Sequence, residues 1–109
     1  MLVTTPVKPI KTSKCIAVVS KHFGLTHRSL KVGIRAVGYY GLPNKLLALM
    51  LKEVAMLSYP AIARIMGRQS KSHSGIMYLC REARQLIKID PDVSRTYEAL
   101  LREARREGS

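Results

Sequence analysis

The apolar residues between positions 43 and 57 constrain the fold more than any other part of the sequence. They recur at intervals of three and four, which is the spacing of one face of an α-helix. The members of this stripe are Leu46, Leu47, Met50, Leu51 and Val54. The stripe is broad, which predicts the central and most buried helix of the fold. Pro43 suits the first turn of this helix, and we expect the helix to end near Leu57.

A chain of 109 residues has room for one core around such a helix. Two independent cores would each be too small to offset the entropy that is lost when their backbone is ordered. We therefore expect one helical domain over residues 10–107. Residues 1–9 contain Thr, Val and Pro without helical periodicity, which predicts a flexible N-terminal arm.

Two further helices are marked by the residues at their ends. The first is predicted to run from Thr12 to Phe23, where Gly24 ends it. The last follows the sequence Asp90-Pro91-Asp92, which interrupts the chain and supplies acids that complement a helix dipole. The apolar face of this last helix consists of Val93, Tyr97, Leu100, Leu101 and Ala104. Residues 32–41 carry three glycines and no clear period, which indicates a loop.

A pair of helices is predicted between these two. Ser58 suits an N-cap, Pro60 loses no hydrogen bond in a first turn, and Gly67 would end the helix after about two turns. A second cap, at Ser70 or Ser72, opens a longer helix. A short helix, a glycine turn of about three to four residues and a second helix form the helix-turn-helix pattern.

The second helix of this pair is predicted to reach Ile87 and has two contrasting sides. With Ile76 at the centre of the buried side, steps of 100° bring the other apolar residues within about 60° of it. These residues are Leu79, Cys80, Ala83 and Ile87. The opposite side collects Ser74, Tyr78, Arg81 and Gln85, with Lys71 before it and His73 at its flank. A recognition helix inserts such a polar amino end into the major groove, although a solvated outer face has the same composition.

These elements together predict an all-α fold, a compact domain of five to six helices with a helix-turn-helix over residues 58–87.

Positive charge is concentrated in the first three quarters of the chain, whose net charge is +12. Residues 1–81 hold 13 Lys or Arg and a single acid, Glu53, whereas residues 82–109 hold six of each sign. A surface that serves only solubility mixes the signs, while a long positive stretch attracts a polyanion. Nucleic acid is therefore the first candidate partner and an anionic membrane surface the second.

The sequence lacks the features of membrane-spanning and secreted proteins. The longest apolar run, Leu46 to Leu51, is too short to cross a bilayer, and the N-terminus does not resemble a signal peptide. We expect a cytoplasmic chain in which Cys15 and Cys80 are reduced and buried in helical cores. Of the two candidate partners that the positive charge suggests, we therefore expect nucleic acid and no membrane.

Catalytic and cofactor sites are not expected either. The His and Cys residues do not fall at metal-ligand spacing. Glu82, the acid nearest to His73, lies more than two helical turns away, so no carboxylate orients this imidazole. The G-x-x-x-K-S tract at positions 67–72 lacks the glycines of a phosphate loop. The sequence therefore predicts no enzyme activity, no metal, no cofactor and no nucleotide.

The segment SYPAIARIMGRQSKSHSGIMYLCREARQLI, from Ser58 to Ile87, resembles the C-terminal DNA-binding domain of the bacterial replication initiator DnaA. The family carries S-x-P-x-I-G-x-x-F-G, then D-H-T-T-V, then C-R. Matching residues in the first motif are Ser58, Pro60, Ile62 and Gly67, and the run from Ser72 to Ile76 occupies the second. Cys80 and Arg81 keep their spacing from the His. Upstream, Pro43, the run Leu51-Lys52-Glu53 and the run Phe23-Gly24-Leu25 are similar to family features, so the resemblance covers roughly residues 10–105.

The resemblance implies a fold like that of the Trp repressor and the DnaA C-terminal domain, and it implies roles for individual residues. It assigns Ser72, His73 and Ser74 to the major groove, Lys52 and Pro60 to the DNA backbone, and Arg35 to the minor groove. Further DNA-binding candidates are the basic or polar residues nearby: Arg28, Lys31, Lys45, Arg68, Ser70, Lys71 and Arg81. The family Asp is Ser72 here and its second Thr is Gly75, so we expect a different preferred DNA sequence.

The implied function is sequence-specific binding of double-stranded DNA by a freestanding bacterial protein of the nucleoid. Such a protein would regulate transcription or replication initiation. Two alternatives stay open. The first is a nonspecific nucleoid-associated protein that uses charge alone, and the second is a helical interaction module that dimerises through residues 91–106. Because a chain this short needs the buried area of its last helix, we favour a monomer. Few aromatic residues are available to stack on single-stranded RNA.

Overall fold

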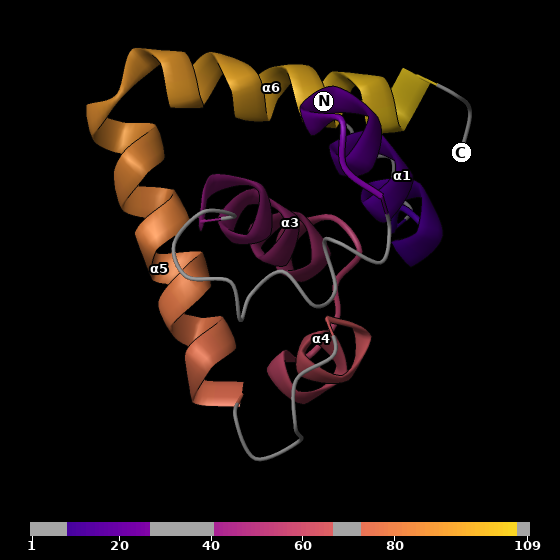
Figure 1. Ribbon diagram of the computed structural model, residues 1–109. Coiled ribbons are helices and arrows are strands. Elements are labelled where there is room, and N and C mark those ends of the chain that lie inside the picture. The colour runs from indigo at the N-terminus through magenta and orange to yellow at the C-terminus, as the bar shows by residue number, and fades with distance from the viewer. Residues whose placement is uncertain (1–8, 27–40, 67–72, 107–109) are drawn as a thin grey trace, which may run out of the picture.

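The computed structural model describes residues 9–26, 41–66 and 73–106, without the side chains of His73 and Ser74. These ranges contain helices and no strand. The helices are α1 (Thr12–Phe23), α3 (Gly41–Glu53), α4 (Tyr59–Ile65), α5 (His73–Ile89) and α6 (Pro91–Arg106) (Figure 1). The fold is a compact all-helical one, as the sequence predicted. Most of the arm at 1–9 and most of the loop at 32–41 lie outside the described residues.

Helix α3 lies at the centre of the fold, with α1, α4 and α5 packed against it. Six consecutive residues, 46–51, are each at most 1% exposed. A helix that is apolar on nearly every side is stable only when neighbours surround it. The prediction of a central, most buried helix over this segment is therefore confirmed. The most extensive contact in the fold is that between α3 and α5.

Helix α1 has the predicted boundaries. Gly24 caps its carboxyl end in the left-handed conformation, with φ of 67°, which glycine adopts without steric cost. The backbone N–H of Leu25 then donates to the carbonyl of Ser20 at 2.9 Å. At the other end, the N–H of Ile10 donates to the carbonyl of Val54 at 2.8 Å, so the chain entering α1 is joined to the chain leaving α3.

The prediction that α3 ends near Leu57 is wrong. The helix ends at Glu53, four residues before Leu57. Met56 turns the chain, because its φ of 59° lies in the left-handed region and cannot continue a right-handed helix. The N–H of Leu57 then donates to the carbonyl of Leu51 at 3.0 Å, which satisfies one of the last helical carbonyls.

Helix α4 begins as predicted. Ser58 is the N-cap, and its hydroxyl accepts a hydrogen bond from the N–H of Ala61 at 3.3 Å. Ile62 and Ala63 face the core and are fully buried. The helix ends at Ile65 with Met66 as its cap, and Gly67 lies outside the described residues. With seven residues, α4 depends on this buried face for its stability.

Helix α5 continues two residues beyond the predicted end, to Ile89. Nothing in Lys88 or Ile89 breaks a helix, and the restriction that Pro91 imposes falls on Asp90. The Asp90 carboxylate accepts from the N–H of Asp92 at 3.0 Å and so caps the next helix. The predicted break at this point is confirmed.

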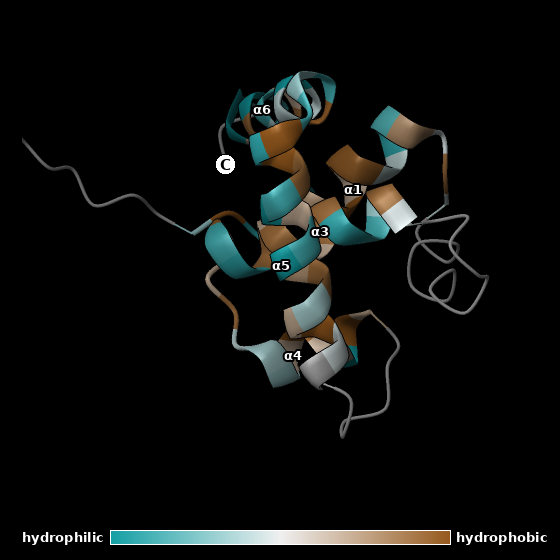
Figure 2. Cartoon of the chain, turned by 90° about the vertical axis from the view of Figure 1, so that its left-hand side faces the viewer, coloured by the Kyte–Doolittle hydropathy of each residue, from teal (hydrophilic) through white to brown (hydrophobic). Residues whose placement is uncertain are grey.

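Helix α6 crosses the end of the molecule and contacts α1 and α5. Hydrophilic residues dominate its ribbon in Figure 2. Its buried residues are Val93, Tyr97, Leu100 and Ala104, while Leu101 is half-buried. The predicted apolar face of α6 is thus used within the chain's own core. Across the described ranges, no helix combines the length and apolarity needed to cross a bilayer.

Candidate nucleic-acid interface

The two sides of α5 differ as the sequence predicted. Ile76, Cys80 and Ala83 have no exposed surface, which makes this side part of the central core. Leu79 and Ile87, at the edges of the stripe, are half-buried. The stripe matches the 3.6-residue period of the helix, so one side of α5 is fixed against α3 and α4. The other side is left available for contacts outside the chain.

Three residues predicted on that other side are described, and all three are exposed. They are Tyr78, Arg81 and Gln85. The phenol of Tyr78 is 53% exposed, and the neighbouring Met77 is 39% exposed. Arg81 was among the candidate DNA-binding residues, and it forms no ion pair with any residue in the described part of the chain.

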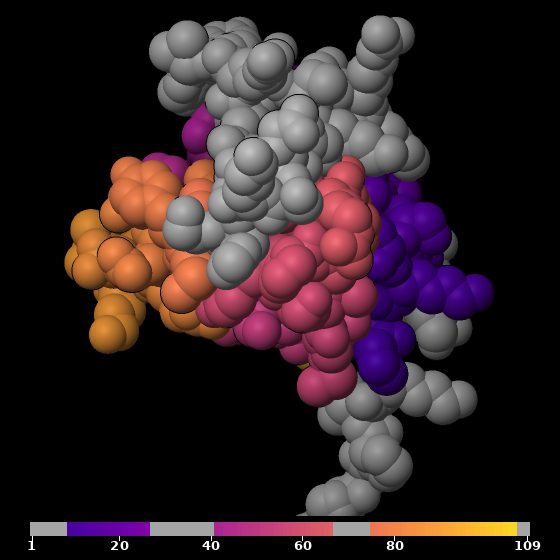
Figure 3. Space-filling view, turned by 90° about the horizontal axis from the view of Figure 1, so that it is seen from below, coloured from indigo at the N-terminus to yellow at the C-terminus, as the bar shows by residue number. Residues whose placement is uncertain are grey.

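The amino end of α5 lies at the end of the molecule opposite α6 (Figure 1). Helix α4 lies beside it, and the view from below shows α4 and α5 next to each other on this face (Figure 3). Between the last residue of α4, Ile65, and the first residue of α5, His73, there are seven residues. The predicted turn of three to four residues falls within this connection. Positions 67–72 of this connection lie outside the described residues.

Lys45 is the first candidate that the structure places in a specific contact. Its Nζ lies 3.8 Å from Oε1 of Glu82, so the ion pair joins α3 to α5. The side chain of Lys45 is 23% exposed and that of Glu82 is 33% exposed, so both are largely buried. A lysine that is already paired with a carboxylate has less positive charge to offer a phosphate. The role of Lys45 in binding DNA stays a prediction.

Lys52 and Pro60 lie where α3 leads into α4. The Nζ of Lys52 lies 4.3 Å from the centre of the Tyr59 ring, a cation–π contact that holds the lysine at the start of α4. Pro60, the next residue, is exposed. The two residues that the family resemblance assigns to the DNA backbone are thus brought to one end of α4.

The other candidates lie outside the described residues or have no described side chain. Those outside the described residues are Arg28, Lys31, Arg35, Arg68, Ser70, Lys71 and Ser72. His73 and Ser74 are the first two residues of α5, and only their backbone is described.

Arg64 is a candidate that the sequence analysis missed. It lies one helical turn after Pro60, so the two residues share one side of α4. Arg64 is exposed, and it pairs with no acid in the described ranges. The signal was present in the sequence, because the four-residue spacing from Pro60 and the burial expected of Ile62 together direct Arg64 outwards.

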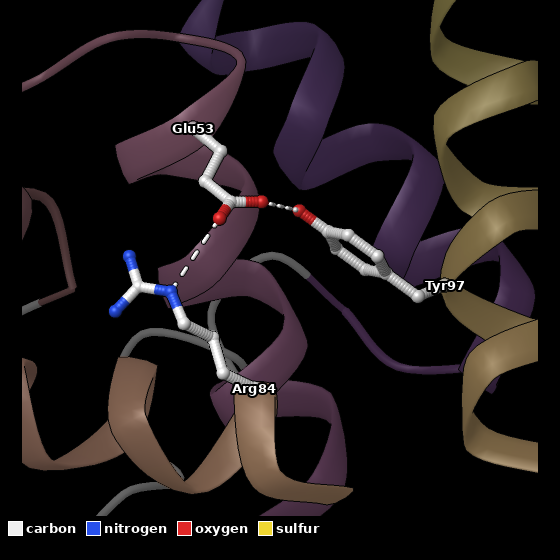
Figure 4. A network of polar contacts seen from close by, with 3 residues as sticks. All are labelled: Glu53, Arg84 and Tyr97. Atoms are coloured by element: carbon white, nitrogen blue, oxygen red, sulfur yellow. Dashed lines mark hydrogen bonds and ion pairs between the residues drawn. The ribbon is translucent and has the colours of Figure 1, made fainter. Parts of the chain in front are cut away.

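Glu53 joins three helices (Figure 4). Its Oε1 accepts a hydrogen bond from the Tyr97 hydroxyl of α6 at 3.1 Å, and its Oε2 lies 3.5 Å from Nε of Arg84 on α5. Burial raises the pKa of Tyr97 well above its usual range, and the negative charge and hydrogen bond of Glu53 raise it further. The single acid of the first 81 residues therefore joins α3 to α5 and α6, while its side chain stays 42% exposed.

Both cysteines are free and fully buried. Burial raises the pKa of the Cys15 thiol to about 11, and burial is also the main cause of the raised pKa of Cys80. A thiol that stays protonated is a poor nucleophile and a poor metal ligand. In the described ranges, no three His, Cys, Asp or Glu side chains come together as a metal site would require.

A hollow of about 330 Å³ lies between α1 and α6, on the side of the fold away from α4. Val18, Ala99 and Leu100 form its apolar part, and Lys21, His22 and Glu103 its polar part. The hollow contains no buried charged group, because His22 and Lys21 are exposed. Its lining is too exposed to hold a ligand away from water.

Comparison with models of known protein families, with characterised proteins and with solved structures yields no match to this chain.

Proposed function

We propose that this chain binds double-stranded DNA sequence-specifically, with α4 and the amino-terminal half of α5 acting as a helix-turn-helix like that of the DnaA C-terminal domain. The observation that carries the proposal is the outer side of α5. Tyr78, Arg81 and Gln85 are exposed along a helix whose other side is locked into the core. A rigid helix with a free polar side is what direct reading of base edges requires.

The distribution of charge supports the proposal. Residues 54–81, which include α4 and the first half of α5, contain no acid. Among the described residues, the acids that follow are Glu82 in the second half of α5, Asp90 after that helix, and the acids of α6, the helix at the other end of the molecule. Glu82, the first acid along α5 from its amino end, is paired with Lys45. Phosphates approaching α4 and the start of α5 would therefore meet mainly positive side chains, and the exposed Glu53 beside Lys52 is itself paired with Arg84.

Specific roles follow for the residues near the start of α5. Ser72, His73 and Ser74 would reach base edges in the major groove. Backbone N–H groups at a helix amino end suit a phosphate. Lys52, Pro60 and Arg64 would contact the DNA backbone beside α4, with Arg68, Ser70, Lys71 and Arg81 adding further contacts.

The remaining part of the proposal concerns the loop and the biological role. Arg35, helped by Arg28 and Lys31, would enter the minor groove. The chain would act as a monomer that regulates transcription or replication initiation in the bacterial nucleoid. It would need no nucleotide, metal or other cofactor.

Selection from randomised duplexes, followed by fluorescence anisotropy, tests the proposal. A specific reader should bind its selected site about a thousandfold or more tighter than random duplex at physiological salt. Equal affinity for every duplex would favour the nonspecific alternative. No binding to any duplex would contradict DNA binding altogether, and the same assay with vesicles containing anionic lipid would then test the membrane alternative.

A further inference from the structure

Tyr78 is an exposed aromatic residue on α5, whereas the tyrosines of α4 and α6 are used for packing within the chain. It is 53% exposed, whereas Tyr97 on α6 is 7% exposed and Tyr59 on α4 is half-buried beneath Lys52. Neither its ring nor its hydroxyl makes a ring contact or hydrogen bond with the described residues. An exposed aromatic side chain with no structural partner is a feature of binding surfaces.

The position of Tyr78 on α5 fits the surface proposed for DNA. Tyr78 lies five residues after the start of the helix at His73, which is a rise of about 7.5 Å along the helix axis. Its side of the helix is the one that bears Arg81, three residues further on, whose guanidinium is exposed. Met77, beside it, is 39% exposed and widens the apolar area. The result is an apolar patch adjacent to a positive charge.

In duplex DNA the bases are stacked, so their faces are closed to an aromatic ring. Base edges remain open in the major groove, and the one apolar group there is the 5-methyl of thymine. A ring that follows a recognition helix into this groove would pack on such a methyl, while the adjacent Arg81 would meet the phosphates. The apolar patch thus matches the thymine methyl, and the positive charge of Arg81 matches the phosphates beside it. Both matches favour duplex DNA over an uncharged protein surface as the partner.

We propose that Tyr78 is a base-reading residue whose ring packs against the 5-methyl group of a thymine in the major groove. The inference rests on the proposed function and extends it to a residue outside the family motif. It makes thymine a required base at one position of the preferred site. Met77 supports the contact, and the Tyr78 hydroxyl is not needed for it.

The test combines substitutions in the protein with the removal of single methyl groups from the DNA. Each thymine of the selected duplex is replaced in turn by deoxyuridine, which keeps base pairing and lacks the 5-methyl. At one thymine the wild-type protein should lose about fourfold in affinity, as expected when one methyl-sized group is no longer buried. Tyr78→Ala should bind the thymine duplex at least fourfold more weakly than wild type, and deoxyuridine should have no further effect. Tyr78→Phe should behave as wild type.

A matched control is Gln85→Ala, which lies on the same exposed side of α5 but two turns further from the amino end, outside the half of the helix assigned to DNA. It should keep the full effect of deoxyuridine. Circular dichroism melting of Tyr78→Ala should match that of wild type, because an exposed side chain without partners adds little to stability. Tyr78→Phe keeps the test valid even where the alanine variant is less stable.

Different outcomes separate the inference from the proposed function. Binding to a selected site with no deoxyuridine effect at any position leaves the function standing and overturns the role of Tyr78. An equal loss for Tyr78→Ala on thymine and deoxyuridine duplexes also overturns it. A wild-type protein that binds all duplexes alike, or none, contradicts the proposed function itself and the inference with it.

Discussion

The phenol of Tyr97 on α6 donates a hydrogen bond to Glu53 at the carboxyl end of α3, with 3.1 Å between the two oxygens. Tyr97 is buried and Glu53 is exposed, so this contact lies at the edge of the core. The second oxygen of the Glu53 carboxylate faces Arg84 of α5 at 3.5 Å. The carboxylate thus connects the central helix to both helices of the carboxyl-terminal half, and its loss should be felt in the stability of the whole fold.

Replacement of Glu53 by alanine should lower the free energy of unfolding by about 1–3 kcal/mol, because the buried Tyr97 hydroxyl would lose its acceptor. The ion pair with Arg84 adds little, since both side chains are nearly half exposed. Glu53→Gln keeps an acceptor and should lose less than about 1 kcal/mol. Urea denaturation measures both values. Equal losses for the two variants would contradict a dominant role for the hydrogen bond.

Tyr97 should also make the fold sensitive to alkaline pH. Its pKa is raised in the folded chain by burial and by Glu53, while in the unfolded chain it titrates near its usual value of about 10. Above that pH the unfolded state binds fewer protons than the folded state, so stability falls as pH rises. Between pH of about 10 and 11, wild type should lose about 1 kcal/mol more than Tyr97→Phe in urea denaturation. Parallel losses in the two proteins would contradict this linkage.

The two thiols should be unreactive in the folded chain. Cys15 has no exposed surface and a pKa of about 11, so little of it is thiolate at neutral pH. Cys80 is equally buried and its pKa is also raised. Ellman's reagent at pH of about 8 should modify neither thiol at a free-cysteine rate, and both should react after unfolding in guanidinium. Fast modification of either thiol in the native protein would show that α1 or α5 opens readily.

His73→Ala should weaken binding to the selected DNA site by about 1–3 kcal/mol and leave binding to random duplex nearly unchanged. The reason is that a base contact distinguishes sequences, whereas a phosphate contact does not. Anisotropy titrations with both duplexes measure the two affinities. An equal loss on both duplexes would assign His73 to the phosphate backbone.

Lys52→Ala and Arg64→Ala should each lower affinity for every duplex and flatten the dependence of log affinity on log salt by about one unit. Arg102→Ala on α6 is a matched control, because this exposed arginine lies on the helix at the other end of the molecule. Its slope should equal that of wild type. An unchanged slope for Lys52→Ala or Arg64→Ala would remove that residue from the interface, provided that its melting curve matches wild type.

Local signals predicted the boundaries that depend on local chemistry. Gly24 ends α1, Ser58 caps α4, and Pro91 begins α6, each because of a conformational preference of that residue alone. The end of α3 was missed because it depends on Met56, a residue with no preference for the left-handed conformation it adopts. Backbone hydrogen bonds from Leu57 to Leu51 and from Ile10 to Val54 flank that turn, and neither is evident from the local sequence.

Some contacts at the candidate site could not be predicted from the sequence, because they join residues on different helices. The exposed side of α5 follows from helical periodicity, which is why Tyr78 and Arg81 were correctly expected to face away from the core. The pairing of Lys45 with Glu82 joins residues 37 positions apart on two helices, and no local pattern reveals it. The cation–π contact of Lys52 with Tyr59 likewise depends on how the chain turns between α3 and α4.

The length of α5 has an electrostatic consequence. Its 17 residues span about 25 Å, and Asp90 and the acids of α6 all follow its carboxyl end. At physiological ionic strength the Debye length is about 8 Å, so these carboxylates lie about three screening lengths from the amino end of the helix. Counterions would hide them from a polyanion bound there. Repulsion between the polyanion and α6 would become noticeable only in dilute salt, where the screening length approaches the length of the helix.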